Sequence, residues 1–312
     1  MKRALISGAG GFLGSHLVRE LGRRWEVIGA GRSENQPRES IDWLRIEDEA
    51  NGLAGAVTRI QPDLLVHAAF LNQKEPGWSE EEYLQRMQAT NFRLFERCAR
   101  LKVPVILISS SAVYGSGGPD GGLDEETPRR PVSLYGLAKA VQEMLAERLA
   151  VSRGLELCIV RLFNLVGPGK AAGTVVPDWV AQVTAIMDGA EPVLRVKNRA
   201  TSRDFVDVRD AARAVELVAR RFVPDEVFNV ASGQTVSLRE VSDYLESLCP
   251  VPYRTVEADA RCGSGDILYQ FGDATRIAKA HGWAPTIGWK QSVREYWDHY
   301  LAARRDGETP SD

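Results

Sequence analysis

Short apolar runs alternate with longer amphipathic stretches through the first 165 residues of the chain. The short runs, rich in Val, Ile, Leu and Ala, predict strands that are buried on both faces, and the stretches between them repeat their apolar residues at helical spacing. This alternation predicts an α/β fold with a doubly wound parallel sheet of the Rossmann type. The predicted strands cover residues 3–7, 26–31, 41–46, 64–69, 105–108 and 157–160, and the predicted helices cover 12–21, 49–60, 80–101 and 135–153.

The pattern changes after residue 165, where loops separate the periodic segments more widely. We expect the chain to leave the sheet there, to return to it for about residues 203–232, and otherwise to build a smaller C-terminal α/β lobe over the carboxyl edge of the strands. The two units then comprise 1–165 with about 203–232, and about 166–202 with 233–305, followed by a polar tail at 306–312.

Within this second half, Asp210 is the expected N-cap of a helix that runs to Arg220, because a carboxylate there accepts the free N–H groups of the first turn. Other helices are predicted at 175–187, 237–248, 273–281 and 289–304, and strands at 192–196 and 227–230.

Composition excludes several classes of protein. A net charge of −3 over 312 residues gives no reason to expect nucleic acid or an anionic membrane surface as a partner. The cysteines and histidines show no paired or metal-ligand spacing, so we expect reduced thiols and no metal. Glycines interrupt the apolar N-terminus after residue 7, so we expect no export signal, no membrane span and a cytoplasmic location.

The first predicted strand is followed at once by Gly8, Gly11 and Gly14 and then by a helix. Glycines let a phosphate approach the backbone, and the helix N-terminus offers free amides and partial positive charge to it. A tight turn that needs positive φ is the alternative interpretation of such glycines. With a strand before and a helix after, the pattern favours a dinucleotide site.

The second predicted strand ends at Gly31, Arg32 and Ser33, where dinucleotide-binding folds often carry an acid for the ribose 2′-hydroxyl. The planar guanidinium of Arg32 suits a 2′-phosphate instead. We therefore favour NADP(H) as the cofactor, with NAD(H) as the alternative, and a solvated loop position as the simpler interpretation of Arg32.

Small residues, Ala68 and Ala69, end the fourth predicted strand, where a flat ligand can lie against the backbone. His67 precedes them and has no visible partner, so we interpret it as a packed core histidine. Asn91, in the middle of a predicted helix, needs a buried partner, and we expect it to brace the strand that leads to Ser109.

The candidate chemistry lies in Ser109–Gly115 and in Tyr135 with Lys139. The serines end an apolar strand, and Tyr135 and Lys139 share one helix face because they are four residues apart. A hydroxyl, a phenol and a nearby ammonium form a proton-handling site for a carbonyl or an alcohol. An ordinary i, i+4 pair at an exposed helix start is the alternative.

Ordered motifs extend these observations over nearly the whole chain. They are Gly8-x-x-Gly11-Phe12-x-Gly14, Ser109-Ser110-Ser111-x-Val113-Tyr114-Gly115, Tyr135-x-x-x-Lys139, Arg161-x-Phe163-Asn164-x-x-Gly167-Pro168 and Arg203-Asp204-Phe205-Val206-x-Val208-x-Asp210. Together they resemble the extended short-chain dehydrogenase/reductase family that acts on nucleotide sugars. Residues 161–169 and the run to Asp210 resemble most closely the GDP-4-keto-6-deoxy-D-mannose reductases within it.

The resemblance implies a role for each matching position. Tyr135 is the general acid/base, Lys139 favours its phenolate and holds the nicotinamide ribose, and Ser110 hydrogen-bonds the reacting oxygen. The implied cofactor-binding residues are Gly8, Gly11, Phe12, Leu13, Gly14, Arg32, Ser33, Ala68, Ala69, Asn91, Tyr135 and Lys139. The implied residues for the nucleotide-diphosphate sugar are Ser110, Ser111, Asn164, Arg203 and Arg261, the last after a shift in its loop.

One departure narrows the reaction. Family members that dehydrate the sugar carry an Asp-Glu pair where this chain has Ser111 and Ala112, and Ala112 cannot transfer a proton. The remaining hypotheses are an NADPH-dependent 4-ketoreductase of a 4-keto-6-deoxyhexose, an NAD-dependent 4-epimerase, and a non-catalytic NADP-sensing protein. The resemblance also implies a homodimer built from helices 80–101 and 135–153.

Overall fold

A computed structural model of the chain describes residues 1–32, 41–47, 51–70, 78–117, 121–169, 173–257 and 267–306. Its centre is a seven-stranded sheet with the order β11-β6-β5-β4-β1-β2-β3, in which every pairing is parallel. The strands are β1 (Arg3–Ser7), β2 (Glu26–Gly31), β3 (Asp42–Arg45), β4 (Leu64–His67), β5 (Val105–Ser110), β6 (Leu157–Leu162) and β11 (Glu226–Val230). The doubly wound parallel sheet predicted from the sequence is confirmed.

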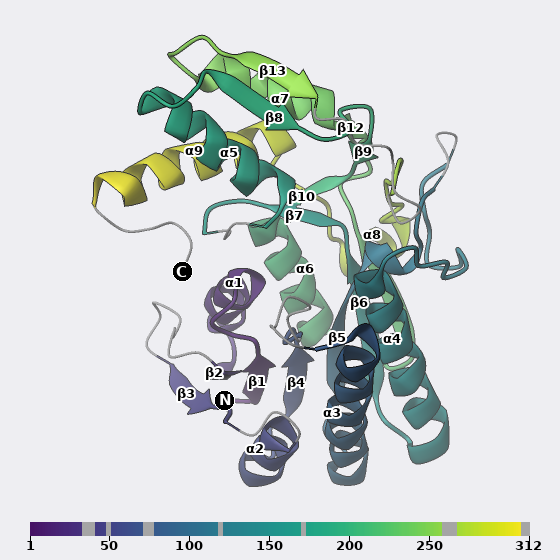
Figure 1. Cartoon of the computed structure of the whole chain (residues 1–312). Helices are drawn as coiled ribbons and strands as arrows, with labels where there is room; N and C mark the ends of the chain where they lie inside the picture. The colour runs from purple at the N-terminus through teal and green to yellow at the C-terminus, as the bar shows by residue number, and fades with distance from the viewer. Residues whose placement is uncertain are drawn as a thin grey trace.

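Helices cover both faces of this sheet (Figure 1). The alternation of side chains along β1 shows why: Ala4 and Ile6 pack with α1 (Phe12–Leu21) and α6 (Val208–Arg220), while Leu5 packs with the helices of the other face. Those helices are α2 (Gly52–Ile60), α3 (Glu80–Leu101) and α4 (Leu134–Arg153). Strand order reverses at β1, which has β2 on one side and β4 on the other, and ligands bind at such a switch point in open parallel sheets.

A second group of elements, with its own apolar cluster, lies over the carboxyl edge of the sheet (Figure 1). Trp179, Val183, Leu245 and Trp297 belong to this cluster. The elements are β7 (Asn164–Val166), α5 (Val175–Met187), β8 (Val193–Val196), β9 (Ser202–Arg203), β10 (Phe205–Asp207), β12 (Val236–Ser237), α7 (Leu238–Leu248), β13 (Arg254–Glu257) and α9 (Trp289–Arg305). Two short elements, η1 (Ser111–Val113) and α8 (Thr275–His281), pack closer to the main sheet.

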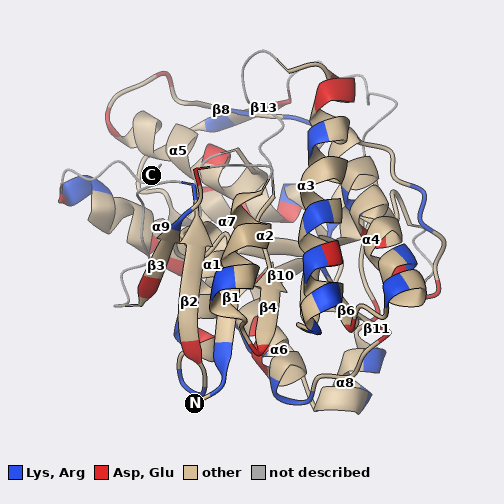
Figure 2. Ribbon diagram, turned by 90° about the horizontal axis from the view of Figure 1, so that it is seen from below, with Lys and Arg blue, Asp and Glu red and all other residues tan. Residues whose placement is uncertain are grey.

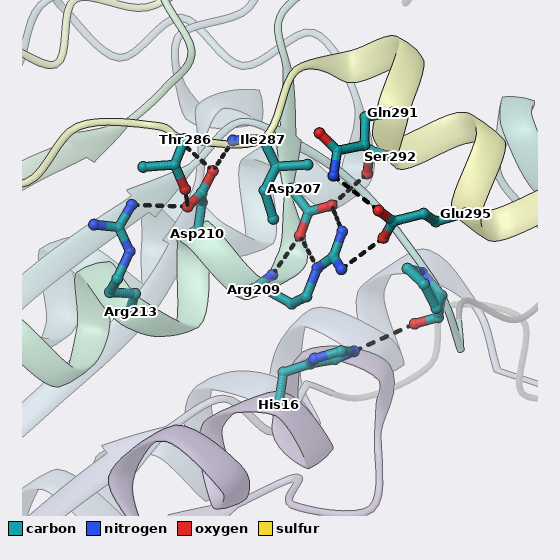
Figure 3. Close-up of polar contacts among 11 residues, drawn as sticks. His16, Asp207, Arg209, Asp210, Arg213, Thr286, Ile287, Gln291, Ser292 and Glu295 are labelled. Atoms are coloured by element: carbon teal, nitrogen blue, oxygen red, sulfur yellow. Dashed lines mark hydrogen bonds and ion pairs between the residues drawn. The ribbon is translucent and has the colours of Figure 1, made fainter.

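The predicted N-cap of α6 is wrong. The helix begins at Val208, and the carboxylate of Asp207 caps it by accepting the N–H of Arg209 over 2.8 Å. Asp210 lies in the first turn and faces another segment, where it accepts the backbone N–H groups of Thr286 and Ile287 (Figure 3). Each Asp can serve as a cap by residue type, and the backbone partners in the fold distinguish them: Asp207 accepts an N–H of the helix itself, whereas Asp210 accepts N–H groups of a distant segment.

Asp207 also joins α6 to α9. It accepts the hydroxyl of Ser292 over 2.6 Å, and Arg209, which it holds, forms a 2.6 Å ion pair with Glu295 (Figure 3). Nearby, Nε2 of His16 on α1 lies 3.3 Å from the carbonyl oxygen of Pro168, in the loop after β7. These contacts fix the second group of elements against the glycine-rich end of the sheet.

Charge is mixed over the surface. Figure 2 shows blue bands along α3 with red among them, and both signs of charge across the other elements visible from this side. Within the described ranges, no helix is both long and apolar enough to cross a membrane, and no cluster of three or more His, Cys, Asp or Glu side chains is arranged to hold a metal.

Candidate functional site

The turn after β1 is packed so closely that Gly8 and Gly14 have no space for a side chain. Gly8 has φ of +74°, and a Cβ there would lie 2.9 Å from Cα of Ala69. A Cβ on Gly14 would lie 2.0 Å from the carbonyl oxygen of Gly8. Gly11 is the N-cap of α1, so the first free amides of that helix open at this turn. The geometry is that of a phosphate cradle.

A cavity of about 450 Å³ extends from this cradle along the ends of β2 and β4. Its walls include half of the twelve predicted cofactor residues, namely Gly8, Gly11, Arg32, Ala68, Ala69 and Asn91, together with Gly31 and Phe70. Phe12 is not among the described lining residues of this cavity and packs edge-on against His16. Ser33 lies outside the described residues. The glycine cradle and the arginine at the wall of this cavity fit a dinucleotide.

A second cavity, of about 510 Å³, adjoins the first, because Ala68 and Phe70 line both. It holds the predicted catalytic residues Ser110, Tyr135 and Lys139 and the predicted substrate residues Asn164 and Arg203. Leu13, predicted on the cofactor side, lines this cavity as well. Residues that are far apart in sequence are therefore brought to one place at the carboxyl edge of the sheet.

Ser110 and Tyr135 lie next to each other on the wall of this cavity. Ser110 is the N-cap of η1, and its hydroxyl oxygen accepts the N–H of Ala112 over 3.2 Å. The phenol of Tyr135 is hydrogen-bonded to Ser110, while 36% of the surface of the residue as a whole is exposed. Removal from water raises the pKa of the Tyr135 phenol, and the Ser110 hydrogen bond opposes that rise. Tyr135 is therefore neutral and able to donate a proton.

Lys139 lies one turn further along α4 with only 3% of its surface exposed. Its Nζ donates to the carbonyl oxygen of Ile108 over 2.8 Å and to Oε1 of Gln142 over 3.1 Å. Nζ also lies 4.1 Å from the centre of the Phe70 ring. Burial lowers the pKa of Lys139 to about 7, with Glu143 opposing that shift. The pKa of the Lys139 ammonium therefore lies near neutral pH.

His67 is buried, as expected of a core histidine, but its ring does have polar partners. Nδ1 lies 2.7 Å from the hydroxyl of Ser7, and Nε2 lies 3.0 Å from Oδ1 of Asn91. Asn91 in turn accepts a 2.7 Å hydrogen bond from Nε2 of Gln142. Asn91 therefore braces strand β4 through His67, and it reaches the active-site lysine through Gln142.

The remaining predicted substrate residues differ in placement. Nδ2 of Asn164 donates to the carbonyl oxygen of Asp204 over 3.2 Å while its side chain lines the cavity. A guanidinium nitrogen of Arg203 donates to the carbonyl oxygen of Ser202 over 2.9 Å, also at the cavity wall. Arg261 lies outside the described residues.

Ser111 is turned away from the cavity. Only 4% of its surface is exposed, and its hydroxyl donates to Oε1 of Gln270 over 2.9 Å. Nε2 of Gln270 returns two hydrogen bonds, to the carbonyl oxygens of Ser111 and Gly115. This geometry does not support the predicted contact between Ser111 and the sugar nucleotide, because its hydroxyl is already engaged away from the cavity.

Sequence reasoning did not single out Phe70, Gln142 or Glu143. Glu143 is fully buried and holds Arg161 through both carboxylate oxygens, at 3.0 and 2.7 Å. The spacing of Gln142 and Glu143 from Lys139, three and four residues along one helix, was the available signal. No feature of the sequence indicated that Phe70 contacts Lys139, because the tertiary fold alone brings the two residues together.

Residues 4–231 match the NAD dependent epimerase/dehydratase family. The chain belongs to this family of extended short-chain dehydrogenase/reductases, and the proteins similar to it include enzymes that modify nucleotide sugars.

Similar proteins catalyse different reactions. The chain is 27% identical to GDP-6-deoxy-D-mannose reductase of Pseudomonas aeruginosa, over 94% of this chain and 95% of that protein. It is 26% identical to UDP-glucose 4-epimerase of Azospirillum brasilense, over 94% of this chain and 93% of that protein. The structure is similar to that of MoeE5 in complex with UDP-glucose and NAD, with a TM-score of 0.83, 28% identity and coverage of 97% and 99%.

Proposed function

We propose that this protein reduces a nucleotide-linked 4-keto-6-deoxyhexose at C4 with NADPH, as a step in deoxysugar synthesis. The observation that carries the proposal is the meeting of Ser110, Tyr135 and Lys139 in one cavity that adjoins the glycine cradle. The similarity to a GDP-6-deoxy-D-mannose reductase supports the same reaction.

Ser110, Tyr135 and Lys139 each have a different role at the carbonyl oxygen of the substrate. The Ser110 oxygen accepts the Ala112 N–H, and the Ser110 hydroxyl, which is hydrogen-bonded to the Tyr135 phenol in the free protein, turns its proton to the carbonyl oxygen of the substrate, where negative charge develops. Tyr135 gives its phenolic proton to that oxygen, and the Lys139 ammonium stabilises the phenolate that remains. NADPH, when bound, supplies the hydride that C4 receives and leaves as NADP⁺. Phenol, ketone and hydride thus become phenolate and alcohol.

Among the described residues that line this cavity, no carboxylate is present to act as acid or base in the elimination of water. Sugar dehydration needs an acid and a base, and the family places them where this chain has Ser111 and Ala112. Ala112 has no transferable proton, and the hydroxyl of Ser111 donates to Gln270 rather than facing the cavity. This arrangement supports hydride transfer without dehydration.

Arg32 supports NADPH over NADH. It lines the cofactor cavity beside Gly31, at the end of β2 where the adenosine ribose of a bound dinucleotide lies in Rossmann folds. We expect Arg32→Ala to weaken NADPH binding about tenfold to hundredfold and to leave NADH binding within about threefold. Fluorescence titration with both cofactors measures this, and an equal effect on the two would contradict the assignment.

The test of the reaction is consumption of NADPH with GDP- and dTDP-linked 4-keto-6-deoxyhexoses, followed by identification of the sugar product. Tyr135→Phe is the matched control, because it removes only the proton donor. Turnover by the wild type that is lost in the control supports the reductase. No turnover, together with NAD retained through purification, overturns it.

A 4-epimerase is the second candidate. The similarity to a UDP-glucose 4-epimerase and to a protein crystallised with UDP-glucose and NAD favours it. Interconversion of UDP-glucose and UDP-galactose without added cofactor is the discriminating result. A non-catalytic NADP-sensing protein ranks third, because such a role does not call for a Tyr135 and Lys139 pair poised at a cavity.

We further propose that the protein forms a homodimer through α3 and α4. Phe92 on α3 is 42% exposed and Met144 on α4 is 60% exposed, and both line one surface hollow between the two helices. Large apolar side chains on adjacent helices favour a helical interface with a second copy. Light scattering measures the mass. Met144→Glu is expected to yield monomers, and Val223→Glu, at an exposed apolar position after α6, serves as the control.

A further inference from the structure

The side chain of Gln142 lies between the active-site lysine and a buried polar chain. Gln142 is 2% exposed, three residues after Lys139 on α4. Its Oε1 accepts the Lys139 ammonium over 3.1 Å, and its Nε2 donates to Oδ1 of Asn91 over 2.7 Å. One amide therefore connects a charged group of the site to a residue on another helix.

The neighbours determine which way this amide points. Nδ2 of Asn91 donates to the carbonyl oxygen of Met87 over 2.7 Å, so Oδ1 faces both His67 and Gln142. Oδ1 can only accept, so His67 carries its proton on Nε2 and accepts the Ser7 proton at Nδ1. The Ser7 oxygen then accepts the N–H of Ala69, at 3.2 Å.

This chain of donors leaves Gln142 one orientation. Its NH₂ group must face Oδ1 of Asn91, so its carbonyl oxygen must face Lys139. The reverse orientation would set two carbonyl oxygens against each other and an NH₂ group against an ammonium. The direction that the Met87 carbonyl oxygen fixes at Asn91 therefore reaches Lys139 through Gln142, and it reaches the Ser7 hydroxyl through His67.

The charges around Lys139 give this contact its importance. Glu143 on α4 is engaged by Arg161 of β6 at 2.7 Å and by Arg129 at 3.4 Å. Tyr135 on α4 and His67 at the end of β4 are the other titratable groups near Nζ among the described residues, and both are neutral near pH 7. Among those residues, the oxygens that accept from Nζ are those of Ile108 and Gln142.

We propose that Gln142 is a positioning residue for Lys139, holding Nζ at the cavity wall with an amide whose direction is set by Asn91, which the Met87 carbonyl oxygen orients in turn. The proposal rests on the proposed function for its kinetic consequences alone. Its structural part concerns the free protein. Loss of the Gln142 oxygen removes an acceptor that favours the charged ammonium, so Lys139 then loses its proton at lower pH.

The test compares two substitutions with opposite expected effects. Gln142→Met keeps the length of the side chain and removes both hydrogen bonds, so it lowers the pKa of Lys139 by about one unit. Gln142→Glu keeps an acceptor beside Nζ and adds negative charge, so it raises that pKa by about half a unit or more. A general packing defect does not produce shifts of opposite sign.

Competitive acetylation of Lys139 in the cofactor-free protein, read by peptide mass spectrometry from about pH 5 to about pH 9, measures the pKa directly. Gln291→Met on α9 is the control and leaves the value unchanged. Opposite shifts in the two Gln142 variants support the proposal. Shifts in one direction only, or no shift in either, overturn it. Should the methionine variant fail to fold, an unchanged or lowered value in the glutamate variant overturns it equally.

The kinetic arm uses NADPH and the keto-sugar. Gln142→Met lowers kcat at neutral pH about tenfold, leaves the KM for the sugar within about threefold, and moves the alkaline limb of the kcat profile to lower pH. A changed KM with an unchanged limb contradicts the positioning role. If the wild type does not turn over the keto-sugar, the proposed function fails, and the acetylation arm still decides the role of Gln142.

Discussion

The hydroxyl of Ser7 lies 2.7 Å from Nδ1 of His67, at the point where β1 and β4 end side by side in parallel register. The other ring nitrogen, Nε2, is hydrogen-bonded to Oδ1 of Asn91. Burial, with a smaller contribution from the Lys139 charge, lowers the pKa of His67 to about 4. The imidazole is therefore neutral in the folded protein and protonates readily once the chain unfolds.

We predict that acid destabilises the fold through His67. The unfolded imidazole has a pKa of 6.5 and the folded one of about 4, so the stabilising contribution is complete above pH 6.5 and is lost as pH falls toward 4. The loss from this group amounts to about 3 kcal/mol. Urea unfolding at a series of pH values measures it.

His67→Gln is the informative variant for that experiment, and His299→Gln on α9 is its control. The His67 variant is less stable at neutral pH, but its stability changes less between pH 6.5 and 4 than that of the wild type. If both variants keep the wild-type dependence on pH, another group is responsible for the acid sensitivity.

Lys139→Met is expected to stabilise the protein while it abolishes catalysis. Burial of an ammonium opposes folding below the folded pKa of about 7, and this opposition declines as pH rises toward 10.5. The substitution also removes the two hydrogen bonds of Lys139. We therefore expect the free energy of unfolding to increase by about 1–3 kcal/mol at pH 6, and by less at higher pH. Thermal unfolding at several pH values checks the trend; a gain that grows with pH would contradict it.

Tyr135→Phe is expected to lower kcat about 10²–10⁴-fold with the fold intact, because only the proton donor is lost. Tyr244→Phe removes a phenolic hydroxyl from α7 and serves as the control. Rates from stopped-flow or steady-state NADPH consumption, with circular dichroism as the check on folding, make the comparison. Activity within about threefold of the wild type would exclude Tyr135 as the acid.

The buried pair of Glu143 and Arg161 predicts an asymmetry between two substitutions. Glu143→Leu leaves the buried guanidinium of Arg161 without its carboxylate and is expected to destabilise the fold by about 3–5 kcal/mol. Arg161→Met is milder, because Arg129 remains 3.4 Å from Glu143. Urea unfolding compares the two, and equal losses would show that Arg129 contributes nothing to the charge balance.

The sheet could be predicted because its signal is local. Runs such as Leu64–His67 are apolar almost throughout, and a strand buried on both faces has that pattern. Strand β5 is longer than predicted, since Ser109 and Ser110 are polar and yet pair with β6. The cap of α6 could not be assigned, because the choice between Asp207 and Asp210 depends on segments near residue 290.

The site was predictable where a motif brings its residues together along one element. Tyr135 and Lys139 are one helical turn apart, so their common location follows from the chain itself. The direction of the Ser111 hydroxyl does not, because it is set by Gln270, which is distant in sequence. The side-chain partners of Asn91, which are His67 and Gln142, could not be predicted for the same reason: each comes from another strand or helix.

The position of β11 at the edge of the sheet has a consequence for synthesis on the ribosome. This strand pairs with β6, but the chain makes α5, β8 and β10 before it reaches Glu226. During synthesis, β6 is therefore an unpaired edge strand of the sheet until the segments between β6 and β11 have been made. A chaperone that protects this edge during synthesis would bind residues 157–162. A protein truncated before residue 226 would lack β11 and would leave this edge exposed permanently.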